Sequence, residues 1–342
     1  MCVIAGYVGT DGAATVLIEM LRREQGMGGG YYTGLATISD GRLHYRKTLG
    51  DLDALLRRTD AADLPGHLGI AHSRSQSGGE DSWAHPFVDT REELAYVANG
   101  AVGYFAHRQN LADIGSAALR RGARFRSAVA EKVGSYPVLG DGSCVHMSEI
   151  MAHEISWLLQ GGDLVQALAR AYCGVPSELA GLCIHTGSPD RLAGCRINMP
   201  MVVGRDAAAT YAATTALALP NSADWILPVP ANSSVGLDRW GARVERLAQP
   251  RAPVLPVPSA QTLTETLIAE LRNHSPRAIG DLCKTAGALW PAGQLGQPNM
   301  AVFQVLWGLW REGRVRWDDI RVPGQYGRGT APLTRFHWVA HS

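Results

Sequence analysis

Residues 1–9 read MCVIAGYVG, and this stretch decides how the rest of the chain is interpreted. From Cys2 to Val8 it is apolar and β-prone, which predicts a buried strand. If Met1 is removed, Cys2 carries both a thiol and a free α-amine, whose reference pKa values lie near ~8.5 and ~8. Such an amine can act as the general base for its own side chain. Taken alone, a Met-Cys start has a simpler explanation, namely a small residue after the initiator.

The segments that follow predict an α+β fold. Apolar residues recur at helical spacing over 12–25, with Asp11 as the expected cap. Asp40-Gly41, between two β-prone runs, predicts a two-residue hairpin over 34–48. Further helices are expected over 51–58, 104–121, 148–159 and 163–171, a polar loop over 73–90, and strands over 67–72, 94–98 and, in short pieces, 179–247. Strands, then helices, then strands indicate mainly antiparallel sheets.

A second, smaller domain is expected at the C-terminal end. Residues 249–259 read QPRAPVLPVPS, and their four prolines are typical of an extended linker. The pattern after it predicts three helices, over 262–272, 277–286 and 299–311, and two strands, over 314–317 and 335–339, around a Gly-rich loop at 324–329. Three helices and a β-hairpin form a winged-helix pattern. The expected division is therefore 1–247 for the first domain, 248–261 for the linker and 262–342 for a winged-helix-like domain.

Composition excludes several classes of protein. The chain has 342 residues, 46% of them hydrophobic, and a net charge of +1, so it is neither disordered nor a basic nucleic-acid coat. Its six cysteines form no CxxC pair and no zinc-ligand spacing, so no metal or cofactor is expected. No apolar run approaches the ~20 residues that span a bilayer. Because the start lacks a signal-peptide pattern and the thiols are scattered, a cytoplasmic location is expected.

Eight short motifs occur in one order along the first 204 residues. They are MCVIAGYVG (1–9), GLATISDGRLHYRKTLG (34–50), GHLGIAHSR (66–74), AHPF (84–87), ANG (98–100), SEIMAHEI (148–155), GGDLVQALARA (161–171) and PDRLAGCRINMPMVVG (189–204). In this set the chain resembles the class II glutamine amidotransferases, which are N-terminal-nucleophile hydrolases, and most of all the glutaminase domain of glucosamine-6-phosphate synthase. The resemblance implies a four-layer αββα sandwich, extending to about residue 247.

The resemblance also implies a role for individual residues. Cys2 would attack the glutamine amide and form a thioester, while its freed α-amine moves the proton. The side-chain amide of Asn99 and the backbone N–H of Gly100 would form the oxyanion hole, where one lost donor costs ~10²–10³ in rate in other enzymes. Arg74 would clamp the α-carboxylate, because a guanidinium donates two parallel hydrogen bonds. The further substrate-binding residues implied are Ser75, Gln76 and Ser77, in a Gly/Ser-rich loop over 75–79 that would cover the pocket, and His85.

The sequence departs from the family pattern at the end of the pocket that would hold the ammonium group. The family has an aspartate where this chain has Met147, and a thioether cannot pair with an ammonium group; Asp141 or Glu149 would have to substitute. Residues 28–33 (GGGYYT) also lack the Arg and Asp that the family shows there. Three explanations remain, in order of preference: glutamine bound differently, another small amide without a free α-amine, or a catalytically altered sensor or regulator that still binds a glutamine-like ligand.

The remainder of the chain bears on partners. Roughly 80 residues follow the linker, too few for the domain that accepts ammonia in the enzymes it resembles. Ammonia would then pass to a separate partner protein, or the chain would act as a homo-oligomer, with no role for a membrane. Residues 262–342 carry nine Arg and Lys against six Asp and Glu, and the helix over 299–311 is nearly all apolar. These features favour a protein-contact or dimerisation module over a nucleic-acid reader, which needs exposed polar side chains.

Overall fold

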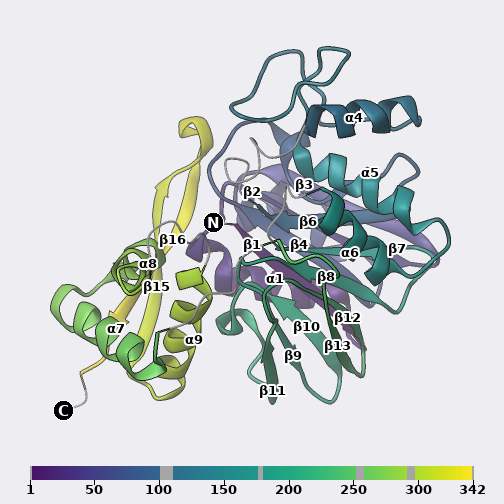
Figure 1. Cartoon of the computed structure of the whole chain (residues 1–342). Coiled ribbons are helices and arrows are strands. Elements are labelled where there is room, and N and C mark those ends of the chain that lie inside the picture. The colour runs from purple at the N-terminus through teal and green to yellow at the C-terminus, as the bar shows by residue number, and fades with distance from the viewer. Residues whose placement is uncertain (1, 101–110, 176–179, 252–257, 291–296, 341–342) are drawn as a thin grey trace.

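The computed structural model describes residues 2–100, 111–175, 180–251, 258–290 and 297–340 (Figure 1). Two antiparallel sheets build the larger part of the chain. The first sheet has the strand order β11-β9-β10-β1-β4-β2-β3, with β1 Val3–Gly9, β2 Tyr32–Ser39, β3 Arg42–Leu49, β4 Leu68–Arg74, β9 Val202–Arg205, β10 Ala209–Ala213 and β11 Trp225–Pro228. The strand that begins next to Cys2 therefore lies in the interior of this sheet, between β10 and β4.

The second sheet supplies the strand that ends at Asn99. Its order is β13-β12-β8-β7-β6-β5, with β5 Phe87–Val88, β6 Leu94–Asn99, β7 Ala180–His185, β8 Leu192–Arg196, β12 Ser233–Asp238 and β13 Gly241–Arg246. All pairings in both sheets are antiparallel among the described residues. The mixed α/β architecture with antiparallel sheets, as predicted, is confirmed.

The two faces of β1 pack against different partners, as the period of two in a strand requires. Ile4 and Val8 join the hydrophobic cluster that contains the second sheet together with α5 (Met147–Leu159) and α6 (Leu164–Gly174). Ala5 and Tyr7 join a second cluster with α1 (Ala13–Glu24) and α2 (Leu52–Arg58). Side chains at the start of β1 are thus surrounded by buried apolar residues on both faces, which holds the strand in place.

Local signals predicted most of these elements, with one error. Asp40 and Gly41 both have positive φ, 51° and 69°, in the turn between β2 and β3, as the two-residue hairpin requires. Asp11 was expected to cap α1, but this is wrong: Gly12 is the N-cap, and no side chain caps the helix. The backbone N–H of Asp11 instead donates to the Tyr7 hydroxyl. Of the helix expected over 104–121, α4 covers Leu111–Arg120, and the earlier positions lie outside the described residues.

The C-terminal segment forms its own hydrophobic cluster. It contains α7 Ala260–His274, β14 Arg277–Ala278, α8 Ile279–Gly287, α9 Gln297–Arg311, β15 Val315–Pro323 and β16 Thr330–Trp338, with the sheet order β14-β16-β15. Leu267, Leu282, Leu306 and Phe336 are fully buried in this cluster. The β15–β16 hairpin is longer than the sequence predicted, and in Figure 1 it extends upward beside the N-terminal residues.

Helix α9 packs against the larger part of the chain. Met300 belongs to the cluster around α1, and Leu217, from the 3₁₀ turn Ala216–Ala218, belongs to the C-terminal cluster. Trp307 and Trp310 border a cavity whose opposite wall includes Leu219. Part of the apolar surface that the sequence predicted for this helix is therefore used within the chain. Among the described helices, none has the length and apolar character needed to cross a membrane.

Candidate functional site

Cys2 lies where the two sheets meet, immediately before β1, and its side chain is buried. From the second sheet, the Asn99 side chain reaches it at the end of β6. Asn99 Nδ2 donates to the Cys2 carbonyl oxygen at 2.8 Å, and the Cys2 backbone N–H donates to Asn99 Oδ1 at 3.3 Å. This reciprocal pair joins the two sheets at the cysteine. Gly100 follows Asn99 directly and is half-buried.

The Cys2 sulfur is in contact with Ser75 and has an acidic pKa. The Ser75 backbone N–H donates to Sγ at 3.4 Å, and the Ser75 hydroxyl lies 3.5 Å from Sγ. Burial acts to raise the pKa of the Cys2 thiol, but hydrogen bonding and electrostatic attraction to His72, with a further hydrogen bond from Ser75, bring it down to about 6. The thiolate, which is the nucleophilic form of cysteine, is therefore the main species at neutral pH.

The tautomer of His72 is set by the neighbouring backbone. Its Nε2 lies 2.8 Å from the carbonyl oxygen of Ala98, which can only accept, so Nε2 carries the proton. In the neutral ring, Nδ1 is then left with a lone pair. His72 is buried on β4 and stands on the same face of the sheet as Cys2, because β4 and β1 pair with Ile4 opposite His72. This arrangement suits an imidazole that takes a proton from a thiol.

Two further buried histidines pack next to His72, His85 directly and His146 through His85. The ring of His85 lies 4.0 Å from that of His72, measured between centroids, and His146 lies 5.3 Å from His85. Burial lowers the pKa of both His85 and His146 well below the usual range, so both rings are neutral at pH 7. His85 Nε2 bonds the Ser148 hydroxyl at 2.9 Å. The structure thus places His85, which was expected to bind substrate, in a buried histidine cluster against His72.

Arg74 is buried at the end of β4 and is held from several sides. Its NH1 donates to the carbonyl oxygens of Trp83, at 2.9 Å, and Gly78, at 3.2 Å, while NH2 donates to the Tyr136 hydroxyl at 2.8 Å. The guanidinium carbon also lies 4.6 Å from the ring centre of Tyr32. A guanidinium has five N–H donors, so these three bonds fix its position and leave donors for a carboxylate.

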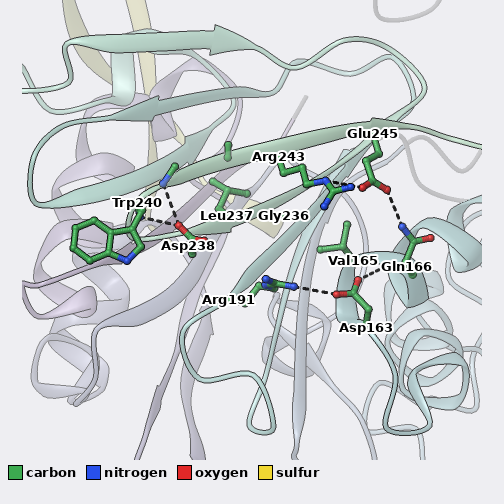
Figure 2. Close-up of a pocket in the computed structure, with 12 residues that line it drawn as sticks. Asp163, Val165, Gln166, Arg191, Gly236, Leu237, Asp238, Trp240, Arg243 and Glu245 are labelled. Atoms are coloured by element: carbon green, nitrogen blue, oxygen red, sulfur yellow. Dashed lines mark hydrogen bonds and ion pairs between the residues drawn. The ribbon is translucent and has the colours of Figure 1, made fainter.

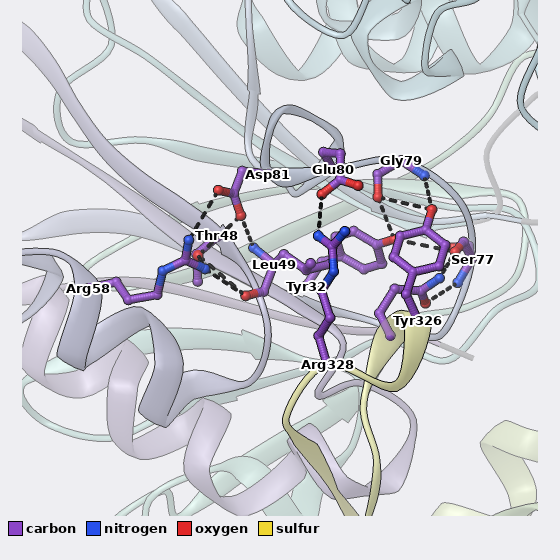
Figure 3. Close-up of polar contacts among 11 residues, drawn as sticks. Tyr32, Thr48, Leu49, Arg58, Ser77, Gly79, Glu80, Asp81, Tyr326 and Arg328 are labelled. Atoms are coloured by element: carbon purple, nitrogen blue, oxygen red, sulfur yellow. Dashed lines mark hydrogen bonds and ion pairs between the residues drawn. The ribbon is translucent and has the colours of Figure 1, made fainter. Parts of the chain in front are cut away.

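The loop over 75–79 connects Arg74 to the rest of the site. The Ser77 hydroxyl donates to the Ser75 carbonyl at 3.2 Å, and Gln76 is exposed. The Tyr32 hydroxyl donates to the carbonyl oxygen of Gly79 at 2.8 Å (Figure 3). The structure therefore brings Cys2, Asn99, Arg74 and the loop together, although Cys2 and Asn99 are 97 residues apart in the sequence.

The expected ammonium end of the pocket holds no free carboxylate at the two positions considered. Met147 is buried in the hydrophobic cluster of the second sheet. The Glu149 carboxylate is buried and accepts from the backbone N–H groups of Arg126 and Ser127, at 2.7 and 2.8 Å, and from the Ser127 hydroxyl. Asp141 is on an exposed turn, where it accepts from Ser143. Neither carboxylate takes over the role of the family aspartate.

Several residues around the site carried no clear sequence signal. No sequence signal assigned a site role to His72, and none singled out Tyr32 or Tyr136, which surround Arg74. Gln325 and Tyr326, which bond the loop over 75–79, lie almost 250 residues further along the chain. Only the AHSR motif, through its histidine, pointed to any of them. Among the described residues, no group of three or more His, Cys, Asp or Glu is arranged to hold a metal ion.

A larger cavity lies away from the cysteine, between α6 and the β12–β13 hairpin (Figure 2). Its volume is about 530 Å³. Four of the charged side chains that line it form ion pairs, Arg191 with Asp163 at 3.0 Å and Arg243 with Glu245 at 2.9 Å, and Asp238 accepts from the backbone N–H groups of Trp240 and Gly241. No cysteine, serine or histidine is among the described residues that line it.

Comparison with known proteins leads to glutamine-dependent enzymes. The glutamine–fructose-6-phosphate aminotransferase (isomerizing) of Thermosynechococcus vestitus is 28% identical over 251 residues, covering 71% of this chain and 36% of that protein. The protein of the same name from Corynebacterium efficiens is 31% identical over 214 residues, covering 60% of this chain and 31% of that protein. The chain thus spans about a third of the length of these curated relatives. No protein-family model matches the chain.

Solved structures agree on the fold. The allosteric regulatory enzyme of purine biosynthesis matches with a TM-score of 0.56 and 17% identity, over 79% of this chain and 58% of that one. The glutamine phosphoribosylpyrophosphate amidotransferase from B. subtilis matches with a TM-score of 0.55 and 16% identity, over 84% and 64%. The chain is thus similar in sequence to glutamine-dependent aminotransferases and in fold to a glutamine amidotransferase. At the level of these homologues, the expectation of an amidotransferase-type enzyme is confirmed.

Proposed function

We propose that the chain hydrolyses the side-chain amide of glutamine through a thioester at Cys2 and releases ammonia. The observation that carries the proposal is a buried cysteine whose pKa is lowered to about 6 and which lies between Ser75 and Asn99. The thiolate attacks the amide carbon, the C–N bond breaks, and the nitrogen leaves with a proton as ammonia. Water then cleaves the thioester to give glutamate and the free thiol.

Two groups are suited to the proton transfers. The Cys2 nitrogen becomes an α-amine if Met1 is removed, and Asn99 Oδ1 already lies 3.3 Å from it. His72, whose Nδ1 has a lone pair, is a second acceptor for the thiol proton. The amine then returns a proton to the leaving nitrogen, in line with the role of terminal amines in other nucleophile activations.

The oxyanion is assigned to Asn99 and Gly100. A side-chain amide has two N–H donors, and one of those on Asn99 Nδ2 is used by the Cys2 carbonyl. The second is free to meet the developing negative charge, together with the Gly100 N–H. Because Asn99 is fixed by two hydrogen bonds before substrate arrives, it needs no reorganisation during the reaction. Arg74 holds the α-carboxylate, with Ser75, Gln76 and Ser77 covering it and His85 supporting the site from the histidine cluster.

A second candidate function is hydrolysis of a small amide that lacks a free α-amine. Burial of Met147 at the position of the family aspartate favours it, as does the full use of the Glu149 carboxylate by three donors. Ammonia release measured with glutamine and with its deaminated analogue as substrates separates the two functions. Higher kcat/KM for the deaminated amide identifies the second.

We further propose that the chain divides into a domain over 1–247, a linker over 248–261 and a winged-helix-like domain over 262–342. The first domain would be an N-terminal-nucleophile sandwich of αββα layers, and the separate C-terminal hydrophobic cluster supports the division. Ammonia would pass to a partner protein or within a homo-oligomer. Packing of α9 against the first domain argues against a DNA-reading role. Six cysteines that are all free support a cytoplasmic location.

Cys2→Ala tests the main proposal. Ammonia release from glutamine, measured on protein whose intact mass reports the state of Met1, should be present in the wild type and absent in Cys2→Ala. An electrophilic glutamine analogue should add one mass increment, located to the N-terminal peptide. Ammonia release that persists in Cys2→Ala would refute the thioester mechanism.

A further inference from the structure

The tip of the β15–β16 hairpin is hydrogen-bonded to the loop over the candidate site. We define the hairpin tip as residues 325–328 and the substrate loop as residues 75–80. Gln325 makes two bonds to one loop residue: its Oε1 accepts from the Ser77 backbone N–H at 3.2 Å, and its Nε2 donates to the Ser77 carbonyl oxygen at 2.5 Å. A side-chain amide therefore pairs with both backbone groups of Ser77, as a neighbouring strand would.

Tyr326 extends this contact by two residues. Its hydroxyl accepts from the Gly79 backbone N–H at 3.0 Å and lies 3.4 Å from the Gly79 carbonyl oxygen (Figure 3). Its backbone has a φ of 55° and a ψ of 25°, in the left-handed region, which costs free energy in a residue other than glycine. A strained conformation persists only where surrounding contacts hold it, and the bonds to Gly79 are such contacts. Arg328 adds an exposed ion pair to Glu80 at 3.1 Å.

The glycines near the start of the chain make room for the hairpin. A Cβ at Gly26 would lie 2.4 Å from Thr334 Oγ1 and 3.0 Å from the Thr334 backbone nitrogen. A Cβ at Gly30, whose φ is +94°, would lie 2.6 Å from Pro332 Cδ. On β15, opposite Pro332, Arg321 bonds the buried Asp51 carboxylate at 2.5 Å. Gly30, in the segment that lacks the family's Arg and Asp, thus packs directly against β16.

The substrate loop connects the hairpin tip to both Cys2 and Arg74. Ser77 bonds Ser75, whose N–H meets the Cys2 sulfur at 3.4 Å. Between the two residues that bond the tip, Gly78 offers its carbonyl oxygen to Arg74 NH1 at 3.2 Å. The tip therefore holds the loop at the two residues that flank the Arg74 contact, and one hydrogen bond separates it from the residue that touches the nucleophile.

We propose that Gln325 and Tyr326 are positioning residues, which hold the substrate loop in the conformation that binds the amide substrate. The inference rests on the proposed function, since it assigns the loop to that substrate. Without the tip, the loop spends less time in the competent conformation, and the apparent affinity falls by that fraction. The chemical step, once substrate is bound, is unchanged. The C-terminal segment thus sets KM for a reaction carried out by the N-terminal residues.

Steady-state kinetics on three single variants test the proposal. Gln325→Ala should raise KM for glutamine about tenfold with kcat within about twofold, because tenfold equals about 1.4 kcal/mol, the size of one or two hydrogen bonds. Tyr326→Phe, which removes only the hydroxyl, should raise KM about threefold. Arg328→Ala is the matched control at the same tip: its ion pair is exposed on both sides, so both constants should stay within about twofold.

Hydrogen exchange gives a readout that needs no activity. Amide exchange should accelerate at Ser77 in Gln325→Ala and at Gly79 in Tyr326→Phe, and at neither in Arg328→Ala. An active wild type whose KM is unchanged in both tip variants overturns the positioning role. Unchanged exchange at Ser77 and Gly79 overturns the contact itself. If the wild type releases no ammonia from glutamine, glutamine hydrolysis is refuted. If the variants still show the expected changes in exchange, the hairpin tip is nevertheless the element that orders the substrate loop.

Discussion

Substitution of His72 by asparagine should change the pH at which Cys2 becomes reactive. In the wild type, the pKa of about 6 means that roughly nine-tenths of Cys2 is thiolate at pH 7. His72→Asn removes the two His72 contributions that lower the pKa, while the burial that raises it and the Ser75 hydrogen bond that lowers it remain. The pKa should then move above ~8.5, the value of a free cysteine, leaving a thiolate fraction of about 3% or less at pH 7.

The rate of alkylation at one pH is a weak measure of this change. A rise of about 2.5 pKa units lowers the thiolate fraction roughly thirtyfold, but it also raises the nucleophilicity of each thiolate by about tenfold, since the Brønsted slope is ~0.4–0.5. The net change at pH 7 is only about threefold. The midpoint of the pH profile is the sharper quantity, because it reports the pKa directly.

The assay is iodoacetamide alkylation followed by peptide mass spectrometry between pH 5 and 9. Thiolate forms as pH rises through the pKa, so labelling of the Cys2 peptide should rise with a midpoint near 6 in the wild type. Burial raises the pKa of Cys183, Cys195 and Cys283, so these thiols stay unlabelled in this range. His185→Asn, at the end of β7, is the control and should keep the midpoint. A midpoint near 6 that survives in His72→Asn would refute the assignment.

Three further predictions concern the remaining groups. Asn99→Ala should lower kcat for ammonia release by ~10²–10³ with a smaller change in KM, because the oxyanion forms only after binding. A kcat equal to that of the wild type would show that Asn99 is not part of the oxyanion hole. Arg74→Lys should raise KM at least tenfold, since an ammonium cannot replace the bonds to Trp83, Gly78 and Tyr136. An unchanged KM would show that Arg74 does not bind the substrate. Glu149→Ala should lower the free energy of unfolding by ~1–3 kcal/mol in urea titrations, because it leaves buried N–H donors unpaired, and a stability equal to the wild type would contradict this.

Sequence reasoning succeeded where the cause was local. The apolar run of β1 and the Asp40-Gly41 turn need only their own residues to specify a strand and a hairpin, and both formed as predicted. The Asp11 cap was wrong because the hydroxyl of Tyr7, four residues earlier, accepts from the Asp11 N–H. The N-cap is one residue later, at Gly12, and the helix begins at Ala13.

Contacts between distant segments were beyond prediction from pattern alone. The GGGYYT segment was recognised as a departure, yet the neighbour that a Cβ at its Gly30 would meet, Pro332, lies some 300 residues away. Gln325 carried no signal at all, because a polar residue in a Gly-rich loop is ordinary. Likewise, the resemblance placed a substrate role on His85, whereas only the packed structure reveals that its ring lies against His72.

The position of Cys2 beside an interior strand has a consequence for turnover. Strands on both sides of β1, and apolar packing on both faces, leave Cys2 almost no freedom. For the proposed reaction, its orientational entropy is then lost once, when the protein folds, rather than in each catalytic cycle. Movement needed for substrate entry and product release then falls to parts that are held by a few hydrogen bonds, the substrate loop and the hairpin tip. The segment that holds Cys2 and the segments that would have to move are thereby separate parts of the same polypeptide.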